Sequence, residues 1–173
     1  MGDHLWIARY LINRVAEDFG ITISFSPKLF MEYNGAGCHI NFSTKTMRQG
    51  SKGMDYIYEI IEKLKPKHAL HLEFYGDNSK RLTGTHETER ADRFSHGVGA
   101  RDASIRIPTS TFTQGGKGYI EDRRPASDID PYVATAVIAD TVLNDGQMIG
   151  ELHEAYSKWK AWRATADIEE AQR

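Results

Sequence analysis

Apolar residues recur at intervals of three and four along much of the chain, which is typical of helices that bury one face. Asp3 and Gly20 fit the N-cap and C-cap of the first such stretch. Pro66 ends the second stretch, and Pro131 occupies the first turn of a later one, where its missing N–H is not needed. The spacing predicts helices over residues 3–19, 54–64, 67–74, 131–143 and 152–170.

Other stretches alternate apolar and polar residues with period two, as half-buried strands do. They cover residues 21–25, 37–43, 103–107 and 118–123. The polar, glycine-bearing stretch 76–99 is too long for a simple connection and is expected to be a functional loop. Helices around scattered strands, without a regular βαβ alternation or a Gly-x-Gly-x-x-Gly motif, favour an α+β fold with an antiparallel sheet.

The composition is that of an ordinary globular protein of 173 residues. Its 22 Lys and Arg nearly balance 24 Asp and Glu, so the net charge of −2 gives no overall attraction to nucleic acid or to an anionic membrane. No targeting signal opens the chain, and no apolar run reaches the roughly 20 residues of a membrane-spanning helix. The single cysteine, Cys38, cannot form an internal disulfide, which suits a reducing compartment, and we expect a cytoplasmic protein.

Period two also separates polar from apolar side chains within the expected strands. Three strands with their polar faces on one side would form a polar trough, a natural floor for an active site in a half-barrel. His39 and Glu121 are the donor types that bind a divalent cation, although two ligands are too few for a tight site. The alternative for His39 is a hydrogen-bonded structural histidine. The polar faces carry His39, Asn41, Ser43, Ser104, Arg106, Tyr119, Glu121 and Arg123.

Positive charge concentrates in residues 78–124, which hold nine Lys or Arg against six Asp or Glu. Arginine binds carboxylates and phosphates through two parallel hydrogen bonds, so several converging arginines would hold a triphosphate and an amino acid. The alternative is a solvated, salt-bridged surface. We expect Arg81 and Arg106 to be exposed and to serve a ligand, so that alanine at either position leaves thermal stability nearly unchanged.

Five motifs stand in a fixed order along residues 1 to about 145. They are Met1-Gly-Asp-His-Leu-Trp-Ile-Ala-Arg9, Asn34-Gly-Ala-Gly-Cys-His39, Arg81-Leu-Thr-Gly-Thr-His-Glu87, Ala103-Ser-Ile-Arg-Ile-Pro108 and Gly118-Tyr-Ile-Glu-Asp-Arg-Arg-Pro125. Together they resemble the C-terminal catalytic domain of eukaryotic glutamine synthetases. The resemblance implies a curved antiparallel sheet, a half-barrel flanked by helices, over residues 1–145, followed by a divergent helical tail over 146–173.

The resemblance also implies a chemistry, that of an ATP-dependent glutamate–ammonia ligase. ATP phosphorylates the γ-carboxylate of glutamate, and ammonia then attacks the γ-glutamyl phosphate. Mg²⁺ or Mn²⁺ and a homo-oligomer with active sites between subunits are implied as well. By matching positions, the resemblance assigns Glu87, Arg101 and Arg123 to catalysis, Asn34, Gly35, Arg81 and Arg123 to glutamate, Ser43, Arg101, Arg106 and Tyr119 to the nucleotide, and His39 and Glu121 to a metal ion.

The sequence also departs from this family, because the N-terminal domain and the segments that complete both metal sites are missing from it. We therefore expect the isolated chain to be inactive as a ligase, to expose apolar surface and to self-associate. Two other functions stay open. One is a truncated, non-catalytic relative that acts as a structural or regulatory subunit, and the other is a minimal nucleotide-binding module without ligase turnover.

Overall fold

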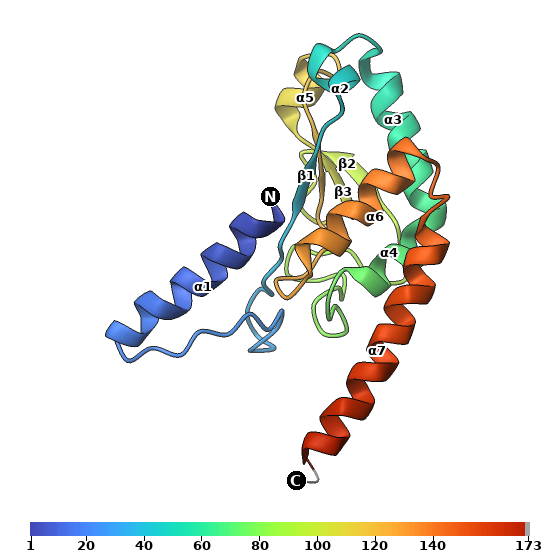
Figure 1. The fold of residues 1–173 in the computed structure, drawn as a ribbon. Helices are drawn as coiled ribbons and strands as arrows, with labels where there is room; N and C mark the ends of the chain where they lie inside the picture. The colour runs from blue at the N-terminus through green and yellow to red at the C-terminus, as the bar shows by residue number, and fades with distance from the viewer. Residues whose placement is uncertain (172–173) are drawn as a thin grey trace.

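A computed structural model describes residues 1–171, with side chains described through Trp162. Most helices pack on one side of a four-stranded sheet, and α1 stands apart on the other side of it (Figure 1). The expected α+β class is confirmed. The elements are α1 (Gly2–Asp18), β1 (Ile40–Phe42), α2 (Lys45–Gln49), α3 (Gly53–Leu64), the 3₁₀ turn η1 (Lys65–Lys67), α4 (His68–Phe74), β2 (His96–Val98), β3 (Ile105–Ile107), α5 (Thr109–Thr113), β4 (Ile120–Asp122), α6 (Pro131–Leu143) and α7 (Ile149–Ala171).

The sheet has the strand order β1-β4-β3-β2. β4 runs antiparallel to both β1 and β3, as expected, whereas β2 runs parallel to β3. The expectation of a purely antiparallel sheet is therefore wrong at this edge. β2 lies at the end of the polar stretch 76–99 and contains Gly97, so it shows no period-two pattern. The other three strands are each shorter than the ranges predicted for them.

Period two divides the sheet into an apolar and a polar face, as the sequence predicts. The isoleucines of β1, β3 and β4 face the helices, and the residues between them face the other way. α3, α4 and α6 cover the apolar face, so the polar face is left for chemistry (Figure 1). The buried core comprises Ile40, Met47, Ile57, Ile60, Ile61, Leu64, Phe74, Tyr75, Ile105, Ile107, Ile120, Ile129, Ala134, Val137, Ile138, Val142 and Ile149.

Local signals set the ends of the core helices. α3 ends two residues before Pro66, where the chain turns through η1 into α4. The Asp130 carboxylate accepts hydrogen bonds from the backbone N–H groups of Tyr132 and Val133, and Pro131 opens α6. Both predicted helices are thus confirmed. The short helices α2 and α5 were not expected from the sequence, and no helix of the described chain is long and apolar enough to span a bilayer.

α1 has nearly the bounds predicted for it, but its caps and its buried face differ. Met1 occupies the N-cap position without a side-chain hydrogen bond, and Phe19, not Gly20, is the C-cap. Only Gly2, Arg9 and Ala16 are buried. The Arg9 guanidinium donates to two backbone carbonyls before α6, and this contact ties the helix to the rest of the fold. Most of the apolar stripe that predicted the helix is therefore exposed.

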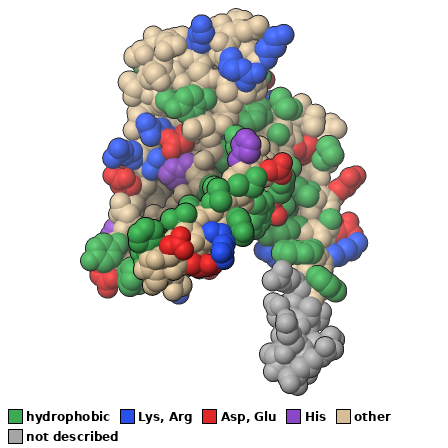
Figure 2. All heavy atoms as spheres, turned by 60° about the vertical axis from the view of Figure 1, so that its left-hand side comes forward, with side chains coloured by type: hydrophobic (Ala, Val, Ile, Leu, Met, Phe, Trp, Pro, Cys, Tyr) green, Lys and Arg blue, Asp and Glu red, His purple; other side chains and the backbone are tan. Residues whose placement is uncertain are grey.

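The strand predicted over residues 21–25 is wrong, because this segment is irregular. No strand within the described chain pairs with it, and a period-two pattern alone cannot supply hydrogen-bond partners. Figure 2 shows hydrophobic side chains gathered in a band across the face that carries α1, with charged side chains above the band. The expected exposure of apolar surface is therefore confirmed here.

Candidate functional site

Glu121 lies at the centre of the polar face of the sheet. It is the middle residue of β4 and stands opposite Asn41 of β1 on one side and Arg106 of β3 on the other. Its side chain is only 12% exposed. A carboxylate this enclosed needs partners, because removing a charge from water is costly unless it is paired.

Three side chains supply these partners. Arg106 Nη1 donates to Glu121 Oε2 at 3.0 Å, and Arg123 Nη1 donates to Oε1 at 3.1 Å. His39 Nδ1 lies 2.9 Å from the same Oε1. The predicted juxtaposition of His39 and Glu121 is therefore confirmed. The Glu121 carboxylate thus forms hydrogen bonds with two guanidinium groups and one imidazole.

The hydrogen bonds of His39 determine which ring nitrogen carries the proton. Arg81 Nη2 lies 3.3 Å from His39 Nε2, and since a guanidinium can only donate, Nε2 must accept. Nδ1–H then donates to Glu121. Burial, and after it the charge of Arg123, lowers the pKa of His39, so the neutral ring is favoured.

Arg81 is buried, contrary to the exposure expected from the sequence, with 3% of the residue accessible. Its guanidinium donates to the backbone carbonyls of Arg123 at 2.7 Å and Arg124 at 3.1 Å, and to Asn78 Oδ1 at 2.9 Å. Burial, followed by the charge of Arg123, lowers its pKa to about 10. A Cβ at Gly37 would lie 2.6 Å from Arg81 Nη2, so a glycine is required for this close approach. Arg81 therefore holds β4 and His39 in place.

Replacing Arg81 with alanine is expected to lower the free energy of unfolding by roughly 3 kcal/mol, because buried carbonyls lose their donors. The Arg106→Ala variant, whose side chain is 32% exposed, should lose at most about 1 kcal/mol. Urea unfolding of both variants measures the difference. Equal losses in the two variants would contradict the assignment of Arg81 as a structural residue.

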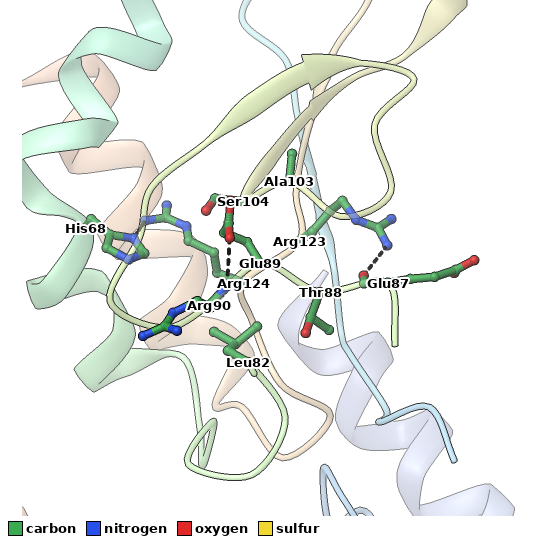
Figure 3. A pocket seen from close by; sticks show the side chains of 10 residues that line it. All are labelled: His68, Leu82, Glu87, Thr88, Glu89, Arg90, Ala103, Ser104, Arg123 and Arg124. Carbon is green, nitrogen blue, oxygen red and sulfur yellow. Dashed lines mark hydrogen bonds between the residues drawn. The ribbon is translucent and has the colours of Figure 1, made fainter. Parts of the chain in front are cut away.

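Glu87 and Arg101 lie at the edge of this cluster. Arg101 Nη1 is 3.4 Å from Glu87 Oε1, and both side chains are more than half exposed. Arg123 Nη2 also reaches the backbone carbonyl of Glu87 at 3.4 Å (Figure 3). His86 and Glu87 both have positive φ, 54° and 59°, a conformation that non-glycine residues rarely adopt. The loop that carries Glu87 is thus held against the polar face in an uncommon backbone conformation.

A small cavity lies between this loop and the end of β4 (Figure 3). Its volume is about 10 Å³, which is room for about one water molecule. Arg123 and Arg124 are neighbours in sequence but project to opposite sides of the cavity, toward Glu87 and toward His68 respectively (Figure 3). The cavity is too small for an amino acid or a nucleotide, so a substrate would have to lie on the open polar face.

The other residues assigned by resemblance lie around the cluster. A Cβ at Gly35 would lie 2.9 Å from Arg81 Cγ, so Gly35 packs against Arg81, and Asn34 is exposed beside it. Ser43 Oγ donates to the Gly118 carbonyl at 2.6 Å, which joins the end of β1 to the residue before Tyr119. Tyr119 is 38% exposed. Ser104, expected on the polar face, is instead buried and bonded to the segment 93–95.

The donor set does not fit a divalent ion by itself. Both Glu121 oxygens accept from arginines, and both ring nitrogens of His39 are engaged. Among the side chains that the structure describes, those of residues 1–162, no group of three or more His, Cys, Asp or Glu could hold a metal ion. Mg²⁺ and Ca²⁺ sites use about six oxygen ligands, so His39 and Glu121 supply too few donors.

A second charged cluster, which was not predicted from the sequence, lies on the core side of β4. Asp122 and Arg124 are both buried and form two hydrogen bonds, at 2.9 and 2.6 Å. Tyr75 donates to Asp122 at 3.0 Å, and Arg124 contacts the imidazole of His71 at 3.1 Å. Period two could have revealed this pair, because Asp122 and Arg124 alternate with Glu121 and Arg123 and must therefore face the core. Charged residues there must be paired to be tolerated.

Burial sets the protonation of this cluster. It lowers the pKa of His71 to about 3, with a further contribution from Arg124. Burial would raise the pKa of Asp122, but the charge and hydrogen bonds of Arg124 outweigh it, and the pKa lies below its ordinary value. The cluster therefore contains an ionised pair beside a neutral histidine at neutral pH.

Comparison with known proteins gives one consistent result. Residues 1–55 match the family model described as the glutamine synthetase catalytic domain. The chain is 56% identical over 147 residues to glutamine synthetase from Agaricus bisporus, covering 84% of this chain and 41% of that protein. It is 58% identical over 144 residues to the Saccharomyces cerevisiae protein of the same name, covering 82% of this chain and 38% of that protein. The chain is thus similar to eukaryotic glutamine synthetases over most of its own length, matches the model of their catalytic domain over residues 1–55, and spans about two fifths of the length of these proteins.

Proposed function

We propose that this chain carries the arginine-lined part of an ATP-dependent glutamate–ammonia ligase site. The observation that supports this most is the sharing of Glu121 by Arg106, Arg123 and His39. Two guanidinium groups against one carboxylate leave net positive charge on an open face. The Nε–H groups of Arg106 and Arg123 are also buried and have no hydrogen-bond partner in the described chain. An oxyanion would satisfy both the charge and these donors.

In this proposal, Arg106 binds nucleotide phosphates, together with Arg101, Ser43 and Tyr119. Arg123 neutralises the γ-carboxylate as it accepts the phosphoryl group, because phosphoryl transfer depends mainly on positioning and charge neutralisation. Asn34 and Gly35 face the glutamate, and the buried Arg81 contributes only by holding His39 and the end of β4 in place. Glu87 would accept a proton from ammonium before ammonia displaces phosphate from the γ-glutamyl phosphate.

Mg²⁺ or Mn²⁺ would neutralise phosphate charge in such a reaction. His39 and Glu121 are proposed as two of its ligands in a site that other donors complete. The segments that complete both metal sites in the resembled family, and that this chain lacks, would provide those donors, in active sites that lie between the subunits of a homo-oligomer. The half-barrel form of the sheet, the boundary near residue 145 and the cytoplasmic location stay predictions.

The proposal predicts that the purified chain binds an oxyanion but forms no glutamine. Calorimetric titration with inorganic pyrophosphate at low ionic strength should show binding. Arg123→Gln and Arg106→Gln should each weaken it roughly tenfold, since a charge-assisted hydrogen bond is lost. Arg14→Gln, on the exposed surface of α1, is the matched control and should change nothing. Absence of pyrophosphate binding to the unaltered chain would contradict the proposal.

Glutamine formation is measured in the same preparations with glutamate, ammonia, ATP and Mg²⁺. The unaltered chain and Arg123→Gln should give the same background, because the donors for the metal are too few. Glutamine formed only by the unaltered chain would show that the isolated chain is a complete enzyme.

A second function, that of a structural or regulatory subunit, is favoured by the exposed apolar surface of α1. It predicts that adding this chain changes the activity or the sedimentation of the full-length Saccharomyces cerevisiae glutamine synthetase. In that case pyrophosphate binding would be lacking.

A further inference from the structure

The backbone carbonyls of Arg123 and Arg124 lie just beyond the end of β4. The N–H group of Arg123 still donates to the carbonyl of Ser104 at 2.9 Å, but the two carbonyls accept hydrogen bonds from side chains. Arg81 donates to both of them, at 2.7 and 3.1 Å, and Asn78 Nδ2 donates to the Arg124 carbonyl at 3.0 Å. Asn78 and Arg81 therefore fix the backbone segment that carries Arg123.

Asn78 is buried, with 8% of the residue accessible, and its amide is bonded on both sides. Nδ2 donates to the carbonyls of Tyr75 and Arg124, each at 3.0 Å. Oδ1 accepts from Arg81 Nη1 at 2.9 Å. Because a guanidinium can only donate, the amide atom that faces Arg81 must be the oxygen. The orientation of the amide is thus determined by its partners.

The backbone of Asn78 also acts on Arg81. The N–H groups of Arg81 and Leu82 both donate to the Asn78 carbonyl, each at 3.2 Å. These bonds close the turn from which the Arg81 side chain starts. The amide oxygen of Asn78 then receives the far end of that side chain. One buried residue therefore holds Arg81 at its backbone and at its guanidinium.

Arg123 is the arginine whose position depends on these contacts. Its Nη1 donates to Glu121 at 3.1 Å, and its side chain is only 11% exposed. Its buried Nε–H has no hydrogen-bond partner in the described chain, so it is available to an oxyanion. Figure 3 shows that its side chain extends toward Glu87 and away from Arg124. A shift of the backbone at the end of β4 would carry this guanidinium away from its place.

We propose that Asn78 is a positioning residue for Arg123. Its amide orients Arg81 and anchors the end of β4, and these contacts keep the Arg123 guanidinium beside Glu121, where it meets an oxyanion. The effect passes from Asn78 Oδ1 to Arg81, and from Arg81 to the Arg123 carbonyl. Asn78 itself needs no contact with the ligand. The inference rests on the function proposed above.

Two variants of the full chain separate the contacts of the Asn78 amide. Asn78→Ala removes all of them, so it should weaken pyrophosphate binding about as much as Arg123→Gln, roughly tenfold. It should also shift the Nε–H signal of Arg123 in ¹H–¹⁵N NMR spectra, where loss of the signal in Arg123→Gln identifies it. Asn78→Asp keeps an oxygen for Arg81 but loses the two donors. It should lower the Tm and leave the Arg123 signal nearly unchanged.

Val137→Ala is the matched control for a loss of stability, because Val137 is buried on α6 and its side chain has no polar atom. It should lower the Tm without changing the pyrophosphate affinity or the Arg123 signal, measured where circular dichroism shows a folded chain. An unchanged Arg123 signal in Asn78→Ala, or the same shift in Val137→Ala, would make Asn78 a merely structural residue and overturn the proposal. An equal shift in Asn78→Asp would overturn the route through Arg81.

If Asn78→Ala does not fold, Arg81→Lys tests the same link. One ammonium group cannot reproduce the fork that reaches both carbonyls, so the Arg123 signal should shift in this variant as well. An unchanged signal would overturn the proposal. The NMR measurement needs no ligand. An unaltered chain that fails to bind pyrophosphate would therefore contradict the proposed function, while the Arg123 signal still decides whether Asn78 positions this arginine.

Discussion

Replacing Arg124 with alanine is expected to lower the free energy of unfolding by about 3–5 kcal/mol, the loss typical of breaking a buried ion pair. The Asp122 carboxylate would lose two hydrogen bonds at 2.9 and 2.6 Å and remain charged where water cannot reach it. The pair is nearly inaccessible, with side chains 1% and 0% exposed. Urea unfolding of the variant and the unaltered chain measures the difference.

The chain offers a close control for this experiment. Arg90 and Asp92 are also two positions apart and form two parallel hydrogen bonds, at 2.8 and 2.7 Å. Their side chains are 62% and 67% exposed, so water replaces the lost partner. Arg90→Ala should therefore leave the unfolding midpoint unchanged. If Arg124→Ala behaved like Arg90→Ala, the buried pair would not be a structural element of this fold.

A second large effect is expected with pH. His71 has a pKa of about 3 in the folded chain, because it is buried and faces Arg124. In the unfolded chain it takes up a proton below its ordinary pKa, roughly 6.5. The unfolded state thus binds more protons than the folded state between these values. The free energy of unfolding should therefore be highest above about pH 6.5 and should fall as the pH decreases below that value. His71 alone should account for a decrease of about 1.4 kcal/mol per pH unit.

His68, whose pKa is also lowered by burial and by Arg124, adds to the decrease in the upper part of this range. Asp122 has a lowered pKa as a carboxylate and contributes only at lower pH. Unfolding free energies measured between pH 6.5 and 4 should show a smaller slope in His71→Gln than in the unaltered chain. His96→Gln, at an exposed position of β2, is the control. An unchanged slope in His71→Gln would show that the histidine is protonated in the folded chain.

The sequence predicted the polar face because its signal is local. Two-residue spacing places Glu121 and Arg123 on one side of β4 and Arg106 on the corresponding side of β3, whatever the rest of the chain does. Arg81 lies in an irregular segment without a period, so its burial depends on contacts with distant carbonyls that no local pattern encodes. The 21–25 segment shows the opposite error, since it has the pattern of a strand but no partner in the described chain.

The sheet order has a consequence for how the charged cluster assembles as the chain folds. Arg106 is 15 positions from Glu121, whereas His39 is 82 positions away. Closing the longer loop costs about 1.5 kcal/mol more in chain entropy by the logarithmic dependence on loop length. β3 and β4 can therefore pair before β1 arrives, as contacts near in sequence generally form sooner. Glu121 thus acquires its first arginine early, and the histidine joins a carboxylate that is already neutralised.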